Sequence, residues 1–300
     1  MPSPPRLLVH AALIGVSVLF GINFVGMKIV LGEVPASAWA LVRIAAATAF
    51  LGPLAWFLRP RTGRPSGRML LALIPAAILG VGGNQLLFAL GLHRTTPAHA
   101  SVITACVPIL TLIAAVVAGQ ERLRWHKVTS LVLALTGVLI LLEVDLGIPD
   151  DGGTWTGDLL VLTNATTYAI YLVLMRRLGR SIDAPTATAL CFAYSVVFVL
   201  PFAAPSFDAS TAATLVRPGI FGWVAFAILG STVTTYLLNN WALRHADSSL
   251  VALYIYTQPI VATALSTAMG HDLPGGRFFL AAALVFAGLC VSTLRRRSAA

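Results

Sequence analysis

The chain contains 300 residues, of which 58% are hydrophobic and only 10% are charged. A soluble domain carries about 25% charged residues, so this chain lacks the polar surface that contact with water requires. The composition excludes a soluble enzyme, a disordered chain and a disulfide-stabilised scaffold, and it leaves an integral membrane protein or a very apolar lipid-binding protein.

Ten apolar segments follow one another along the chain, most of them close to the roughly 20 residues that an α-helix needs to cross a bilayer. They cover residues 7–31, 36–58, 69–92, 97–118, 128–143, 155–175, 185–204, 218–241, 247–269 and 276–294. These segments are continuous apolar runs, whereas a membrane β-barrel has short segments of alternating polarity. The sequence therefore predicts an all-α integral membrane protein with ten transmembrane helices.

The basic residues indicate how the segments are oriented. Most of the 20 Lys and Arg residues flank the segments on one side, which is also the side of both termini. Because cytoplasmic loops are enriched in Lys and Arg, we expect both termini in the cytoplasm. The formal net charge of +9 follows from this topology and from attraction to anionic lipid, so nucleic acid is not an expected partner.

The second half of the sequence repeats the first. With a shift of 151 positions, the third to fifth segments align with the eighth to tenth without a gap, and Pro108 meets Pro259. Each half has five segments, and an odd number inverts the second half in the membrane. We therefore predict two inverted five-helix repeats, residues 1–145 and 153–297, with a substrate site between them near the middle of the membrane.

Short motifs recur in the two halves. Residues 19–28 (LFGINFVGMK) and 41–43 (LVR) resemble the first-helix signature and the second-helix arginine motif of the drug/metabolite transporter superfamily, EamA type. A resemblance to the end of an EamA repeat is found at residues 89–90, 97–101, 108 and 119–121. A second copy of the same pattern is found at residues 242–244, 248–251 and 259. Three departures are Phe20, where a tryptophan is common, Gln120, which separates Gly119 from Glu121, and residues 270–272 (GHD), which lack the usual Gly-Glu pair.

This resemblance implies a carrier of the inner membrane, usually an exporter of amino acids or other small metabolites. It also implies a central cavity lined by the first, third, fourth, sixth, eighth and ninth helices.

Apart from Arg277, which lies at the very start of the last segment, Lys28 and Arg43 are the only strongly basic residues within the predicted segments. A charge at membrane depth is costly and usually functional, so either cation could anchor a substrate carboxylate or serve as a structural counter-ion. For Lys28 the alternative is snorkelling to the membrane surface, since it lies near a helix end. For Arg43 the alternative is pairing with the carbonyl groups at a helix end.

Polar and aromatic side chains within the segments complete the set of candidate substrate-binding residues. Amides and tyrosines at this depth either line a cavity or form hydrogen bonds between helices, and packing or contact with lipid is the alternative for each. The candidates are Asn23, Lys28, Arg43, Asn84, Gln85, His99, Tyr168, Tyr171, Asn239, Asn240, Trp241, Tyr254 and Gln258.

No Asp or Glu lies deep within a predicted segment, so a carboxylate proton relay is not expected. His99 is the best candidate for a titratable group, because an unperturbed histidine changes charge near pH ~6.5. The sequence contains no nucleotide-binding loop, catalytic triad or metal-ligand spacing. We therefore expect no cofactor, no metal and no catalytic residue.

The sequence predicts a secondary transporter of the inner membrane that exports amino acids or related small metabolites by alternating access. The alternatives are an efflux carrier for drugs or cationic compounds, a passive channel for small metabolites and, less favoured, an intramembrane lipid-modifying enzyme. The expected partners are a small-molecule substrate and the lipid bilayer. Coupling to protons and exchange are both open, and no oligomeric state is predicted.

Overall fold

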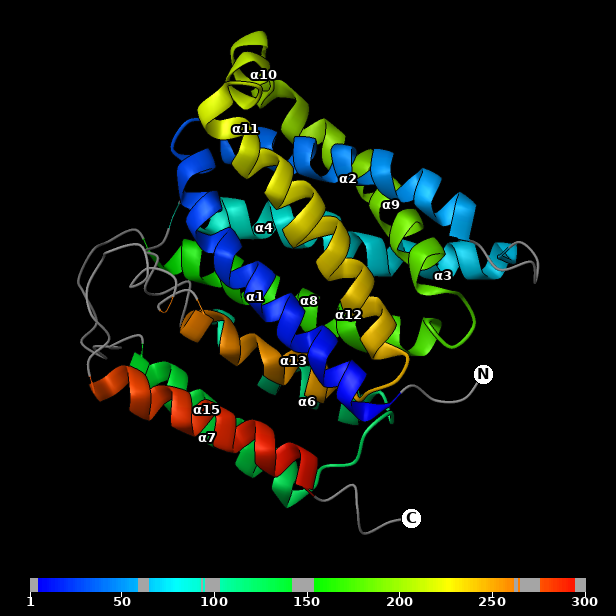
Figure 1. The fold of residues 1–300 in the computed structure, drawn as a ribbon. Coiled ribbons are helices and arrows are strands. Elements are labelled where there is room, and N and C mark those ends of the chain that lie inside the picture. The colour runs from blue at the N-terminus through cyan, green and yellow to red at the C-terminus, as the bar shows by residue number, and fades with distance from the viewer. Residues whose placement is uncertain are drawn as a thin grey trace.

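A computed structural model describes residues 5–58, 65–92, 94, 103–141, 154–261, 264 and 276–294, and the regular elements within these ranges are all helical (Figure 1). The elements before residue 142 are α1 (Arg6–Leu31), α2 (Ala36–Leu58), α3 (Gly67–Ala77), η1 (Ile78–Gly82), α4 (Gly83–Leu92), α6 (Val107–Val117) and α7 (Trp125–Leu141). Those after residue 153 are α8 (Thr154–Leu178), α9 (Ala184–Ala203), η2 (Ala204–Ser206), α10 (Ala209–Leu215), α11 (Pro218–Ala225), η3 (Phe226–Thr234), α12 (Thr235–Leu243), α13 (Ser248–Leu253), η4 (Tyr254–Thr257) and α15 (Gly276–Leu294).

The predicted all-helical membrane protein is confirmed in its coarse form. In the part of the chain that the structure describes, six helical stretches are long and apolar enough to cross a membrane: Arg6–Asn23, Ala36–Leu58, Gly67–Gly91, Trp155–Leu178, Ala184–Ser206 and Pro218–Leu243. Four further apolar helices are shorter within the described ranges: Val107–Val117, Trp125–Leu141, Ser248–Val261 and Gly276–Ser292. Each of these stretches falls within or overlaps one of the segments expected from hydropathy.

Capping side chains fix where two helices begin. The Asp183 carboxylate accepts a hydrogen bond from the Thr186 backbone amide at 2.9 Å and starts α9. Asp208 accepts one from the Thr211 amide at 2.8 Å and starts α10. The hydrogen bonds from the Thr211 amide and hydroxyl and from Ser210 hold the pKa of the exposed Asp208 carboxyl below its usual value.

Two long helices contain a π-helical turn in their middle, where one extra residue widens the helix. The turn η1 joins α3 to α4, and η3 joins α11 to α12. A Cβ atom at Gly80 in η1 would overlap the Tyr171 ring of α8, so the glycine permits this close crossing of two helices. The Tyr236 hydroxyl of α12 donates to the Gly80 carbonyl at 3.0 Å.

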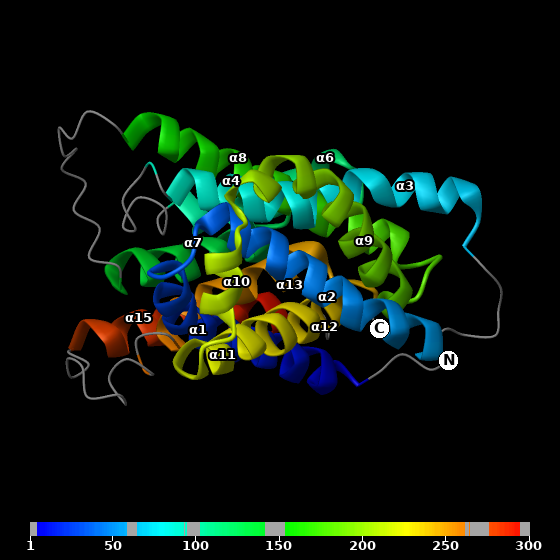
Figure 2. The same cartoon turned by 90° about the horizontal axis from the view of Figure 1, so that it is seen from above.

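Helices from the two parts of the chain pack in pairs. The α7–α15 pair lies along one edge of the bundle in Figure 1, and α2 packs on α9 in both views (Figures 1 and 2). At the α7–α15 crossing, a Cβ atom on Gly137 would meet the Ala281 carbonyl at 2.7 Å, and one on Gly288 would meet the Ser130 carbonyl at 2.6 Å. The two glycines therefore allow the backbones to approach closely.

The described chain enters and leaves the bundle at one end. In Figure 1, α1 begins and α15 ends on the same side, and α8 and α12 also end there. This side is called the terminal end below, and the side on which α1 ends and α2 begins is called the opposite end.

Candidate functional site

A buried arginine lies at the contact between α1, α2 and η3. Arg43 is 8% exposed, and its guanidinium donates to the Ser231 hydroxyl at 2.9 Å and to the Thr232 hydroxyl. It also contacts the Ser231 carbonyl at 3.5 Å and the Met27 sulfur at 3.7 Å. Arg43 thus bonds to hydroxyl groups and a carbonyl of the π-helical turn in the middle of a helix, and not to carbonyls at a helix end.

Asn23 belongs to the same group of polar side chains. Its amide oxygen accepts a hydrogen bond from the Ser231 hydroxyl at 2.6 Å, so Ser231 connects Asn23 of α1 with Arg43 of α2. Asn23 is 7% exposed and Ser231 is fully buried. We call Asn23, Met27, Trp39, Arg43, Ser231 and Thr232 the arginine cluster.

A second group of candidates meets nearer the terminal end. The Tyr171 hydroxyl donates to the Asn240 amide oxygen at 3.0 Å, and the Asn240 amide nitrogen donates to the Thr188 hydroxyl at 2.8 Å. Tyr168 stacks on Tyr171 with ring centroids 5.7 Å apart, and its hydroxyl bonds to Asn239. We call these five residues the tyrosine–amide cluster, which joins α8, α9 and α12.

The other candidates lie apart from these two clusters. Tyr254 bonds to His10 at 2.6 Å, the Asn84 backbone carbonyl accepts from Asn164 at 2.6 Å, and Trp241 packs on His245 at 4.8 Å between ring centroids. Gln85 and Gln258 are partly buried. Lys28 lies in the last turns of α1, with its side chain outside the described set, and His99 lies outside the described residues.

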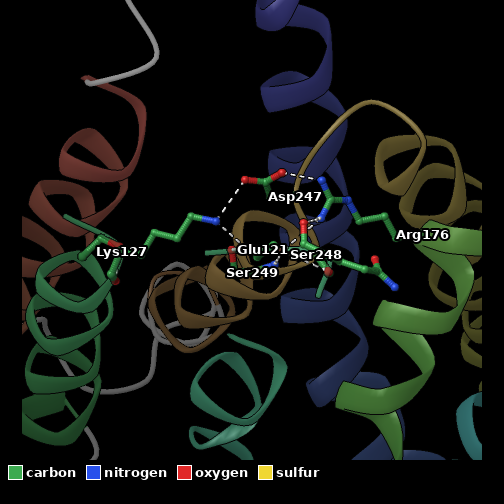
Figure 3. Close-up of polar contacts among 8 residues, drawn as sticks. Glu121, Lys127, Arg176, Asp247, Ser248 and Ser249 are labelled. Atoms are coloured by element: carbon green, nitrogen blue, oxygen red, sulfur yellow. Dashed lines mark hydrogen bonds and ion pairs between the residues drawn. The ribbon is translucent and has the colours of Figure 1, made fainter. Parts of the chain in front are cut away.

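Four charged side chains form a network at the terminal end (Figure 3). Glu121, whose side chain is 1% exposed, binds Lys127 at 2.5 Å and Arg176 at 3.3 Å. Asp247 binds the same two cations, Lys127 at 3.1 Å and Arg176 at 2.5 Å. Glu121 also accepts hydrogen bonds from the Ser248 hydroxyl and from the Ser249 amide and hydroxyl. We call these four charged residues the charge network.

The turn after α6 positions the Glu121 side chain within the charge network. Gly119 has φ = 67°, a left-handed conformation that glycine adopts without strain, and it ends the helix there. The inserted Gln120 donates its side-chain amide to the Val173 carbonyl of α8 at 2.9 Å. The departure of the sequence from the family motif thus ties this turn to α8.

Sequence reasoning missed most partners in these clusters. Lys127 and Arg176 count toward membrane orientation, and nothing in their local sequence indicates an ion pair with a residue far along the chain. Trp39 and Met27 resemble ordinary apolar residues of a helix. The spacing of Trp39 and Arg43, four residues apart, is the one local signal that places both side chains on the same face of a helix.

The described chain is a helical membrane protein with polar groups buried between its helices. The model of the EamA-like transporter family matches residues 7–143 and again residues 155–294. The chain belongs to this family.

Named relatives agree with this assignment. An uncharacterized transporter of Archaeoglobus fulgidus is 26% identical over 91% of this chain and 93% of its own length. The uncharacterized transporter YyaM of Bacillus subtilis is 25% identical, covering 89% of this chain and 88% of its own. The uncharacterized inner membrane transporter YedA of Escherichia coli is 26% identical, covering 94% and 90%. One crystal structure matches 99% of this chain and 100% of its own, with a TM-score of 0.80 and 20% identity, and it has the same fold.

Proposed function

We propose that this chain is a secondary transporter of the inner membrane that exports amino acids or related small metabolites by alternating access. In this proposal the two halves, residues 1–145 and 153–297, are inverted five-helix repeats with ten membrane-spanning helices in all. Both termini face the cytoplasm, so the terminal end of the bundle is the cytoplasmic end.

Related positions in the two halves support the inverted repeat. The offset of 151 positions that aligns the sequences moves η1, residues 78–82, onto residues 229–233, which lie within η3. The same offset relates Gly137 to Gly288 and Ser130 to Ala281. At the α7–α15 crossing each glycine faces the carbonyl of the other pair's member on the opposite helix, Gly137 that of Ala281 and Gly288 that of Ser130. A sequence match of low identity would not require matched helix irregularities, so they count as independent support.

The charge network is the main observation that supports the proposed alternating-access mechanism. Glu121 and Lys127 come from the first family match, whereas Arg176 and Asp247 come from the second, so the network bridges the two halves at one end. At the opposite end, Arg217 pairs with Glu33 at 2.7 Å, but these side chains are 54% and 49% exposed. Exposed ion pairs stabilise little, and the side chains of the charge network are only 1% to 24% exposed, so we infer that the terminal end of the bundle is the closed end.

The buried polar clusters suit a small polar or zwitterionic cargo better than a cationic drug. Arg43 would repel a cation that entered the interior of low dielectric constant, whereas hydroxyl, amide and phenol groups can bind amino or carboxylate groups. The driving force is open in this proposal, either exchange of solutes or coupling to protons.

Reconstitution into liposomes tests the proposal. Vesicles loaded with one amino acid should take up the same radiolabelled amino acid faster than unloaded vesicles, and uptake should saturate with concentration. A passive channel would instead give linear flux that internal solute does not stimulate. Absence of stimulated uptake for every amino acid and related metabolite in a broad panel would refute the proposal.

A further inference from the structure

Two buried N–H donors of α2 converge on a single sulfur atom of α1. The Trp39 indole Nε1 lies 3.0 Å from the Met27 sulfur, and Arg43 Nη1 lies 3.7 Å from it. Trp39 is only 2% exposed and Arg43 8%. A thioether sulfur is a weak acceptor, so a guanidinium and an indole share a partner that satisfies neither well.

Among the residues that the structure describes, no group that contacts Arg43 balances its charge. These acceptors are the hydroxyl and carbonyl of Ser231, the Thr232 hydroxyl and the Met27 sulfur, all of them uncharged. A buried cation that lacks a counter-charge is costly, and an ionised ligand would lower that cost.

The other contacts of Arg43 orient its guanidinium through Nε and Nη2 and do not involve Nη1. Ser231 and Thr232 hold Nε and Nη2, and Ser231 in turn donates to Asn23. Nη1 is therefore aimed at the sulfur by bonds made elsewhere on the guanidinium, and Trp39 lies one helical turn away on the same face of α2. Two donors held in this way match the two oxygens of a carboxylate.

We propose that Arg43 Nη1 and Trp39 Nε1 form a binding site for the carboxylate of the transported solute, and that the Met27 sulfur fills this site when it is empty. The inference rests on the proposed function and specifies its substrate class, small molecules with a carboxylate group. The unbranched Met27 side chain changes rotamer easily, so it leaves when a stronger acceptor arrives. The charge-assisted hydrogen bonds of a carboxylate are about twice as strong as neutral ones.

The test compares amino acids with their amides, which keep the side chain and amino group but lack the carboxylate. In proteoliposomes of the full chain, L-leucine and L-threonine are compared with L-leucinamide and L-threoninamide as competitors for stimulated uptake, after the transported amino acid has been identified. We expect the amides to compete at least about tenfold more weakly, which matches the loss of one hydrogen bond to a charged group.

Three variants address the individual atoms. Trp39→Phe keeps an aromatic ring but loses the N–H, and it should weaken competition by the amino acids about tenfold while changing competition by the amides little. Met27→Leu keeps the volume but removes the competing acceptor, and it should strengthen amino acid binding. Arg43→Gln should abolish the preference for acids over amides. The matched controls Trp56→Phe, on an exposed part of α2, and Met69→Leu should leave the preference unchanged.

The outcomes separate this inference from the proposed function. If stimulated uptake occurs but acids and amides compete equally, or if Trp39→Phe and Met27→Leu leave the ratio at the wild-type value, the carboxylate site is refuted and the transporter stands. If no solute gives stimulated uptake, the proposed function fails first. Thermal unfolding of each purified variant identifies loss of fold, and the two conservative variants keep the test valid if Arg43→Gln does not fold.

Discussion

Replacing Glu121 by Gln should open the terminal end of the bundle. The Glu121 side chain is 1% exposed and faces two cations, so the neutral variant leaves Lys127 and Arg176 with Asp247 as their remaining anion. Removing one partner of a buried ion pair costs about 3–5 kcal/mol, and because Asp247 remains we expect the lower value. A change of about 3 kcal/mol shifts the ratio of closed to open states roughly 100-fold.

Labelling of a cysteine near the network measures this shift. Ser130 is 2% exposed and lines a small pocket together with Lys127 and Asp247. Ser130→Cys is placed in a chain whose native cysteines are replaced by alanine, and a membrane-impermeant maleimide is added from either side of the vesicle. Glu121→Gln should accelerate labelling from the side that the terminal end faces.

The matched control is Glu33→Gln at the opposite end. The exposed pair of Glu33 and Arg217 is worth about 0–1 kcal/mol, so this variant should leave the labelling rate at Ser130→Cys nearly unchanged. Equal labelling rates in Glu121→Gln and the parent would show that the charge network does not hold this end closed. Faster labelling from the external side would reverse the proposed orientation.

Three other predictions address packing and pH. Gly288→Ala should lower the free energy of unfolding in detergent by about 1–3 kcal/mol, because the added Cβ overlaps a backbone carbonyl. The control Gly15→Ala should leave the protein as stable as the parent, because a Cβ there meets nothing within 4 Å. Equal melting temperatures of the two variants would contradict the close crossing of α7 and α15. Tyr171→Phe leaves the buried Asn240 oxygen without its donor and should cost about 1–3 kcal/mol in the same assay, and a neutral result would mean that the hydrogen bond is absent. Asp208→Ala should speed amide exchange in α10 at neutral pH. Because the carboxyl pKa is lowered in the fold, this stabilisation is present above the usual carboxyl pKa and is lost as the pH falls through the lowered value; a difference between variant and parent that persists in strong acid would contradict the cap.

Hydropathy predicted the helices because membrane residence imposes a local requirement on each segment of about 20 residues. The same reasoning selected Asn23 and Arg43, since polar groups at membrane depth are rare whatever they contact. Their shared partner Ser231 lies 188 positions from Arg43 in the chain, and no local pattern encodes that distance. The π-helical turn adds a further obstacle, because its extra residue shifts which side chains share a face.

The charge network escaped prediction for a different reason. Arg176 and Lys127 lie at helix ends, where basic residues are expected from the positive-inside rule alone. Nothing in the local sequence distinguishes a cation that faces lipid headgroups from one that binds a buried carboxylate. The turn at Gly119 and Glu121 was recognised as a motif, but its function in joining α6 to α8 and α13 depends on tertiary contacts.

The charge network also has an electrical consequence. Its two carboxylates and two cations have formal charges that sum to zero, so separating them in the proposed alternating access would move little net charge through the membrane field. A membrane potential does work of about 2.3 kcal/mol per elementary charge per 100 mV, and on a neutral set of groups that work largely cancels. The voltage dependence of transport would then be set by the charge of the cargo and by Arg43, and opening of the terminal end would respond weakly to the resting potential of the cell.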